Sequence, residues 1–235
     1  MDAHAHPDPK APFPAADPTT PVEWFRPGRP DVRAERILRI QGYGDLGKVR
    51  PAIRRAAEYA AELAAQLSEP VVCFRRVEVR SLAGPRLELD GGITLRCAAF
   101  ERLLADCREA VPFVLTVGPG LDRKVVEFTE SGEGLLEALL LETAGWLAIE
   151  DATRQFRAAE RERAESRDLR ITPRLGPGYR YAAHGGECEW QLTDQPALFR
   201  LFGGAPLPVR VLPSCAMLPK ISRSGLFGVR PAAAA

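Results

Sequence analysis

Apolar residues recur at helical spacing in two long parts of the chain. From Pro51 to Leu67 they fall three or four positions apart, and Pro51 stands where a first helical turn tolerates proline. A second pattern runs from Gly134 to about Arg163, apolar in its first half and mostly charged and Ala beyond Arg157. We expect two helices here, the second ending in a solvated charged half. Shorter helices are expected over residues 33–40 (capped by Asp31), 100–104 and 194–202.

Short apolar runs between these helices predict strands. Asp90-Gly91-Gly92 separates two alternating runs, which predicts a hairpin. Helices and hairpin-linked strands are mixed without a regular strand–helix alternation, so the order favours an α+β fold with a mostly antiparallel sheet. Strands are expected over residues 71–74, 77–79, 87–89, 93–95, 111–117, 209–212 and 222–229.

The ends of the chain differ in composition from the middle. Residues 1–30 contain eight prolines and little apolar periodicity. Such a segment cannot bury enough surface to offset its ordering entropy, so we expect a disordered arm. Residues 31–230 are predicted to form one domain, followed by a frayed tail over residues 231–235.

Charge and hydropathy exclude several classes of partner. The 32 Lys and Arg residues nearly balance the 31 Asp and Glu residues, for a net charge of +1. This balance removes the electrostatic reason to expect a nucleic acid or an anionic membrane as partner. No apolar run is long enough to span a bilayer, and the first residues show neither a basic start nor an apolar stretch. We therefore expect a soluble, cytoplasmic protein.

Cysteine and histidine usage gives little support to metal or nucleophile chemistry. The five cysteines are widely spaced and form no C-x-x-C pair, which disfavours a disulfide framework or a structural zinc site. Of the three histidines, His4 and His6 lie in the expected arm. Only His184, close to Cys188, leaves open a small hydrolase with a Cys–His nucleophile, and it is a distant alternative.

The segment over residues 174–179, RLGPGY, is the most informative in the chain. It places the guanidinium of Arg174 beside backbone groups that glycine leaves exposed, with the ring of Tyr179 able to stack on a planar group. Such a loop can hold a small zwitterion, because the arginine fork takes a carboxylate and the carbonyl oxygens take a cation. A structural loop around a salt-bridged arginine fits the same residues.

These six residues also match a known motif. Arg174-x-x-x-Gly178-Tyr179 resembles the R-x-x-x-G-Y motif of the S-adenosylmethionine-binding activation domain of cobalamin-dependent methionine synthase. The resemblance spans roughly residues 33–230, is most specific in the last third, and there looks like the short stand-alone members of the family. It continues through Gln195, Leu198-Phe199, Val209–Leu212 and Ser214-x-x-Met217-x-Pro219-Lys220-x-x-x-Ser224-Gly225.

The resemblance implies a fold and a ligand site. The fold would be α+β, a curved, mostly antiparallel sheet with flanking helices, and the ligand would be S-adenosylmethionine. Arg174 would hold the ligand's carboxylate, and Asp45 is one position for the family's ligand-binding aspartate. The chain departs from the pattern over Arg180–Glu189 and at Arg223, which separates two serines. The site residues implied are Arg174, Leu175, Gly176, Gly178 and Tyr179.

The resemblance also implies a role and partners. The family's domain presents S-adenosylmethionine to a cobalamin that has become inert, and an electron from a flavoprotein or ferredoxin-type reductant completes the reductive methylation. The chain carries no D-x-H-x-x-G motif, so the cobalamin is expected on a partner, a corrinoid-binding protein or a split methionine synthase. This chain would then be an accessory component. The alternative is a non-catalytic module that docks on a corrinoid protein without binding S-adenosylmethionine.

Overall fold

An antiparallel sheet forms the centre of the protein in a computed structural model that describes residues 21–132, 134–183 and 185–232. Within these residues the sheet has eight strands, in the order β1-β2-β6-β3-β4-β5, with β12 on the other edge of β6 and β7 beyond β12. The strands are β1 (Glu23–Phe25), β2 (Val71–Phe74), β3 (Val77–Ala83), β4 (Arg86–Leu89), β5 (Ile93–Arg96), β6 (Glu109–Thr116), β7 (Leu169–Ile171) and β12 (Ser222–Pro231).

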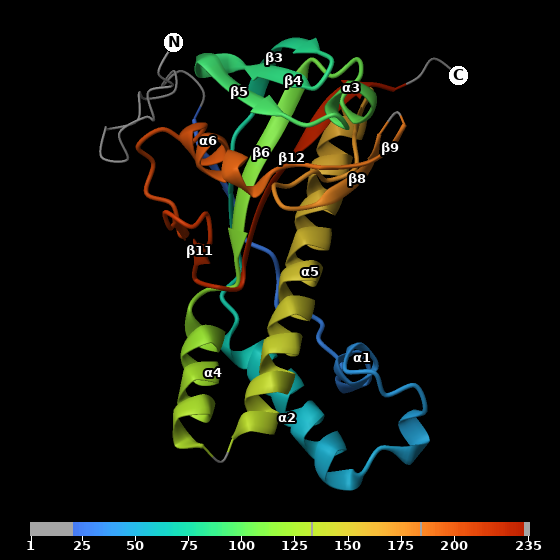
Figure 1. The fold of residues 1–235 in the computed structure, drawn as a ribbon, viewed down its shortest axis with the longest axis vertical. Helices are drawn as coiled ribbons and strands as arrows, with labels where there is room; N and C mark the ends of the chain where they lie inside the picture. Colours follow the sequence, from blue (N-terminus) through green and yellow to red (C-terminus); the bar gives the residue numbers. More distant parts are fainter. Residues whose placement is uncertain (1–20, 133, 184, 233–235) are drawn as a thin grey trace, which may run out of the picture.

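Helices flank the sheet and extend beyond it. The longest, α5, runs from the sheet to the far end of the molecule, where it packs against α2 and α4 (Figure 1). The predicted α+β class, a curved antiparallel sheet with flanking helices, is confirmed. The helices are α1 (Ala34–Ile40), α2 (Pro51–Leu67), α3 (Phe100–Leu103), α4 (Gly120–Ser131), α5 (Leu135–Glu165) and α6 (Gln195–Arg200), with 3₁₀ turns η1 (Leu46–Lys48), η2 (Asp90–Gly92) and η3 (Leu192–Asp194).

Two apolar cores lie on the two faces of the sheet. Successive side chains of a strand point to opposite faces, and β6 accordingly gives Phe113 to one core and Val114 to the other. The first core lies under α2 and α5, where Phe156 packs its ring against Phe113 at 5.4 Å. The second core lies under α3, α6 and the β3–β5 hairpins, around the fully buried Trp190.

The charged half of α5 differs from the prediction. We expected a solvated face, but Phe156, Glu160 and Ala164 are buried at intervals of four residues, which is one stripe of a helix. Glu160 can be buried because its carboxylate accepts a hydrogen bond of 2.7 Å from Arg76. Most residues of this segment are charged, so its composition did not indicate the helix face that packs against the sheet.

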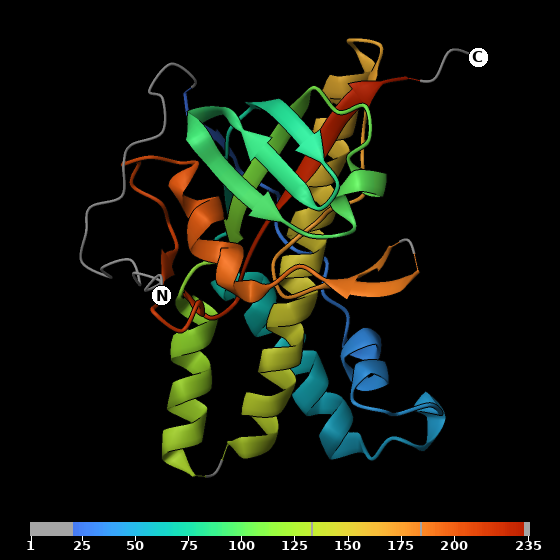
Figure 2. The ribbon, with the colours of Figure 1, turned by 45° about the horizontal axis from the view of Figure 1, so that its top comes forward.

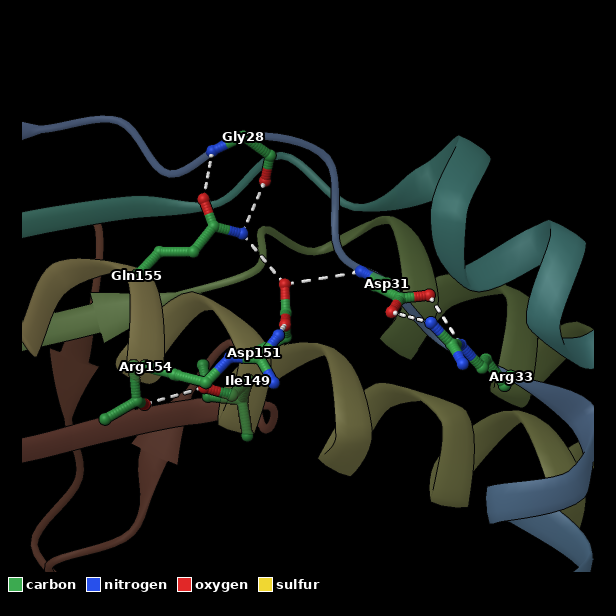
Figure 3. A network of polar contacts seen from close by, with 8 residues as sticks. Gly28, Asp31, Arg33, Ile149, Asp151, Arg154 and Gln155 are labelled. Atoms are coloured by element: carbon green, nitrogen blue, oxygen red, sulfur yellow. Dashed lines mark hydrogen bonds and ion pairs between the residues drawn. The ribbon is translucent and has the colours of Figure 1, made fainter. Parts of the chain in front are cut away.

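The chain before Asp31 is also better ordered than predicted. The expected arm includes β1, which pairs with β2, while residues 1–20 lie outside the described part. Figure 3 shows the next residues bound to α5: the amide of Gly28 donates to the Gln155 side chain at 2.7 Å. The amide of Asp31 donates to Asp151 at 3.3 Å, and its side chain pairs with Arg33 instead of capping α1. Contacts with β2 and α5 hold this segment in place, and no local sequence pattern predicts such contacts.

The remaining differences concern elements the patterns did not indicate. Helix α4 was not predicted, and the expected strand over residues 209–212 is only the two-residue β10 (Arg210–Val211), paired with β11 (Met217–Leu218). A further hairpin, β8 (Arg180–Ala183) and β9 (Gly186–Glu189), occupies the segment that departs from the family pattern. Pro231, the first residue of the expected tail, pairs with Leu169 of β7, and the amide of Ala232 donates to the carbonyl of Asp168 at 3.1 Å.

None of the helices in the described residues combines the length and apolar character needed to cross a membrane.

Candidate functional site

The predicted ligand loop lies along one edge of β12. Leu175 exchanges two hydrogen bonds with Leu226, at 2.9 Å and 2.8 Å, and the amide of Thr172 donates to the carbonyl of Gly228 at 2.9 Å. These bonds extend the sheet edge that begins with β7, so the backbone on both sides of Arg174 is fixed. A fixed backbone limits the positions that the Arg174 side chain can take.

Two glycines of the loop are explained by its geometry. A Cβ at Gly176 would lie 2.9 Å from the carbonyl oxygen of Ser224 and 3.1 Å from Nη1 of Arg174, so only glycine fits. Gly178 has a φ of 81°, which L side chains rarely adopt. Its amide donates to the carbonyl of Trp190 at 2.6 Å, which ties the loop to the second core.

Arg174 stacks on an aromatic ring of the loop and leaves one nitrogen without a partner. Its guanidinium carbon lies 4.4 Å from the centroid of the Tyr179 ring, a cation–π contact. Nη1 is buried without a hydrogen-bond partner, and no carboxylate among the described residues forms an ion pair with Arg174. Among the described residues Arg174 is therefore not the salt-bridged arginine of the alternative, and its buried donor can be met by water or by a ligand.

Tyr181 of β8 holds the loop through two hydrogen bonds. Its hydroxyl accepts from the amide of Gly176 at 2.7 Å and donates to the carbonyl of the same residue at 3.1 Å. Burial raises the pKa of Tyr181, so the hydroxyl stays protonated and keeps both bonds at neutral pH. The β8–β9 hairpin, which Figure 2 shows projecting sideways past α5, thus helps to position the ligand loop.

A hollow of about 200 Å³ opens beside the loop. One wall is Pro177 and Tyr179, and another is the polar start of β12. The side chain of Gln195 is buried there, donating to the carbonyl of Cys215 at 2.7 Å and accepting from Ser224 at 3.0 Å. The residues that line the hollow include Trp146, Pro177, Tyr179, Gln195, Arg223 and Ser224.

Arg223 differs from Arg174 in pairing with a carboxylate, through contacts with two side chains of α5. It donates to the hydroxyl of Thr153 at 2.9 Å and pairs with Glu150. The Arg223 guanidinium holds the pKa of the Glu150 carboxyl below its usual range. Arg223, which separates the two serines, therefore joins β12 to α5.

The five predicted site residues lie in one loop, where Tyr179 lines the hollow, and the other candidates lie elsewhere. Asp45 accepts a hydrogen bond of 2.9 Å from the amide of Gly47 and caps η1. His184 lies outside the described residues, and Cys188 faces Cys97. Trp146 and Tyr181 were missed as parts of the site, because one belongs to an apolar helix pattern and the other to a segment without a recognised motif.

Comparison with known proteins supports the fold. No protein-family model matches the sequence, and no curated protein matches it. The fold is similar to that in a crystal structure of the MetH reactivation domain bound to AdoHcy, with a TM-score of 0.56 and 15% sequence identity. The similarity covers 96% of this chain and 83% of that chain. The protein therefore has the fold of that reactivation domain over nearly its whole length.

Proposed function

We propose that this protein binds S-adenosylmethionine through the loop over residues 174–179. The observation that carries the proposal is Arg174, whose guanidinium is held against Tyr179 with Nη1 buried and unpartnered. A carboxylate placed at Nη1 would satisfy this donor, and the planar fork of a guanidinium pairs bidentately with carboxylates. The methionine part of the ligand supplies that carboxylate.

The shape of the site sets how the ligand would lie. The hollow of about 200 Å³ is smaller than typical pockets for whole ligands, which have about 300–1,000 Å³. It suits one end of S-adenosylmethionine, with the remainder lying over the outer surface near Tyr179, whose side chain is 39% exposed. A ligand bound in this way keeps its reactive methyl group accessible to a second protein.

We infer that the second protein carries a corrinoid. When bound, S-adenosylmethionine supplies an electrophilic methyl group, and the residues of this chain bind and orient it. Similarity to a reactivation domain seen with AdoHcy supports an accessory role in the reductive methylation of a corrinoid protein such as a split methionine synthase. The protein would then resemble the stand-alone members of the family, with a flavoprotein or ferredoxin-type reductant as electron donor.

A docking module that does not bind S-adenosylmethionine is the second candidate. It is favoured by an apolar groove of about 490 Å³ between α4, α5 and β11, which includes Val126, Trp146 and Leu218. These three side chains are 52%, 46% and 40% exposed. Trp146 lines both the groove and the hollow, so a partner seated in the groove would meet the ligand loop.

Titration calorimetry with S-adenosylmethionine tests the first candidate. Arg174→Ala is expected to weaken binding by about 2–4 kcal/mol, because a charge-assisted pair is lost from a partly buried site. Arg174→Lys should restore little of this, since an ammonium cannot reproduce the planar fork. The ligand should also raise the melting temperature of the wild type by mass action.

Arg170→Ala is the matched control, because Arg170 is an exposed arginine of β7 whose side chain bonds only the carbonyl of Pro231 among the described residues. It should bind like the wild type. A folded wild type that shows no binding at millimolar S-adenosylmethionine, with or without a corrinoid protein, would overturn the first candidate. Binding of the corrinoid protein alone would then favour the docking module.

A further inference from the structure

Two cysteines that are far apart in the sequence face each other in the structure. The sulfur atoms of Cys97 and Cys188 lie 3.7 Å apart, although 91 positions separate the two residues. Cys97 follows β5 and is buried, whereas Cys188 lies on β9 and is partly exposed. Figure 1 places α3, which begins shortly after Cys97, on the same side of the molecule as the β8–β9 hairpin. All five cysteines are free thiols in this structure.

We propose that Cys97 and Cys188 form a reversible disulfide and are an oxidative modification site. A disulfide requires its sulfur atoms at about 2.05 Å, so the two thiols must approach further. The hairpin can supply that movement, because β8 and β9 pair only with each other within the described residues. Cys97 packs in the second core, so Cys97 would stay in place while Cys188 moves towards it.

The chemistry needs one oxidant, for which glutathione disulfide serves. The Cys188 thiolate attacks one sulfur of glutathione disulfide, forms a mixed disulfide and releases one glutathione. The Cys97 thiolate then attacks the Cys188 sulfur, closes the protein disulfide and releases the second glutathione. The two protein thiols lose two electrons and two protons, and the two glutathione thiols gain them.

The two thiols differ in a way that suits this order. Cys188 is reached by solvent, so it meets the oxidant first. Burial keeps the oxidant away from Cys97 and raises the pKa of this thiol to about 11, so its thiolate forms rarely at neutral pH and the closing step is the slower one. Cys97 therefore acts as the resolving thiol.

The disulfide would stiffen the support of the ligand loop. Cys188 is the cross-strand partner of Tyr181, whose hydroxyl holds both backbone groups of Gly176. Linking β9 to Cys97 fixes the hairpin against the second core and so fixes Tyr181. This consequence concerns the loop's backbone and holds whether or not the loop binds S-adenosylmethionine.

Oxidation of the folded full chain with glutathione disulfide tests the proposal. We expect two of the five thiols to be lost, and a non-reducing digest to show a peptide that joins Cys97 to Cys188. The melting temperature should rise by roughly 5–10 °C, because the bond closes a long loop of the unfolded chain. Amide hydrogen exchange should slow over residues 176–189, and dithiothreitol should reverse all three changes.

Two serine variants make the test specific. Cys188→Ser should abolish the linkage and the rise in melting temperature, whereas Cys215→Ser, at another partly exposed cysteine, should leave both intact. Five thiols remaining after oxidation would overturn the proposal. So would a glutathione adduct that persists on Cys188, or a linkage between other cysteines.

Discussion

Gly225 lies where β12 and the candidate ligand loop come closest. A Cβ at this position would sit 2.3 Å from the carbonyl oxygen of Leu175, and that oxygen is already bonded to the amide of Leu226. Backbone cannot move aside as a flexible side chain can. Gly225→Ala should therefore lower the free energy of unfolding by about 2–3 kcal/mol, measured by urea denaturation.

Gly204→Ala provides the matched comparison, since no atom lies within 4 Å of the Cβ it would add. Its stability should stay within about 0.5 kcal/mol of the wild type. Equal midpoints for Gly225→Ala and the wild type would show that the loop does not approach β12 as closely as described.

The two arginines near the hollow show how identical side chains take different roles. Arg223 is buried and pairs with Glu150 and Thr153, so it joins β12 to α5. Arg174 has the aromatic contact with Tyr179 and a buried nitrogen without a partner. Availability for a ligand is therefore a property of the neighbours that each arginine meets, which explains why a motif was needed to single out Arg174.

At the scale of elements, the short strand β1 is the clearest case of a segment ordered by distant contacts. It pairs with β2, and Phe25 packs on Phe156 with ring centroids 5.7 Å apart. Arg29 donates to the carbonyl of Ala65 in α2 at 2.8 Å. A chain that begins at Asp31 should melt roughly 5–10 °C below one that begins at Pro21, as measured by circular dichroism.

The comparison of these two truncations isolates residues 21–30, because both lack the preceding twenty residues. Equal melting temperatures would mean that β1 and the contacts with Gln155 contribute nothing measurable. In that case the predicted arm over residues 1–30 would stand.

At the scale of the whole molecule, the two cores are joined by shared strands. Residues of β6 and β12 alternate between them, with Phe227 in the first core and Leu226 in the second. Neither core can lose its packing without disturbing strands of the other. We therefore expect one cooperative unfolding transition, seen at the same midpoint by near- and far-ultraviolet circular dichroism.

Phe156→Ala in the first core and Leu87→Ala in the second core test this coupling, since both side chains are fully buried. Each should destabilise the protein by about 2–5 kcal/mol and shift the single transition without splitting it. A separate early transition in Leu87→Ala would show that the β3–β5 hairpins unfold independently.

The sequence by itself determined the features that depend on neighbouring residues. Apolar spacing located α2 and α5, alternation around Asp90–Gly92 located the β4–β5 hairpin, and the R-x-x-x-G-Y motif located the loop. These signals are readable because helix period, strand period and turn chemistry are set over a few residues. Together they were enough for the α+β class, and they indicated the loop that we propose as the ligand site.

Only the tertiary structure decided which distant groups meet. It paired β1 with β2, buried Glu160 beside Arg76, and placed Cys97 against Cys188. It also left Nη1 of Arg174 without a partner among the described residues. Contacts of this kind depend on the path of the whole chain around the two cores, and no local pattern of residues encodes them.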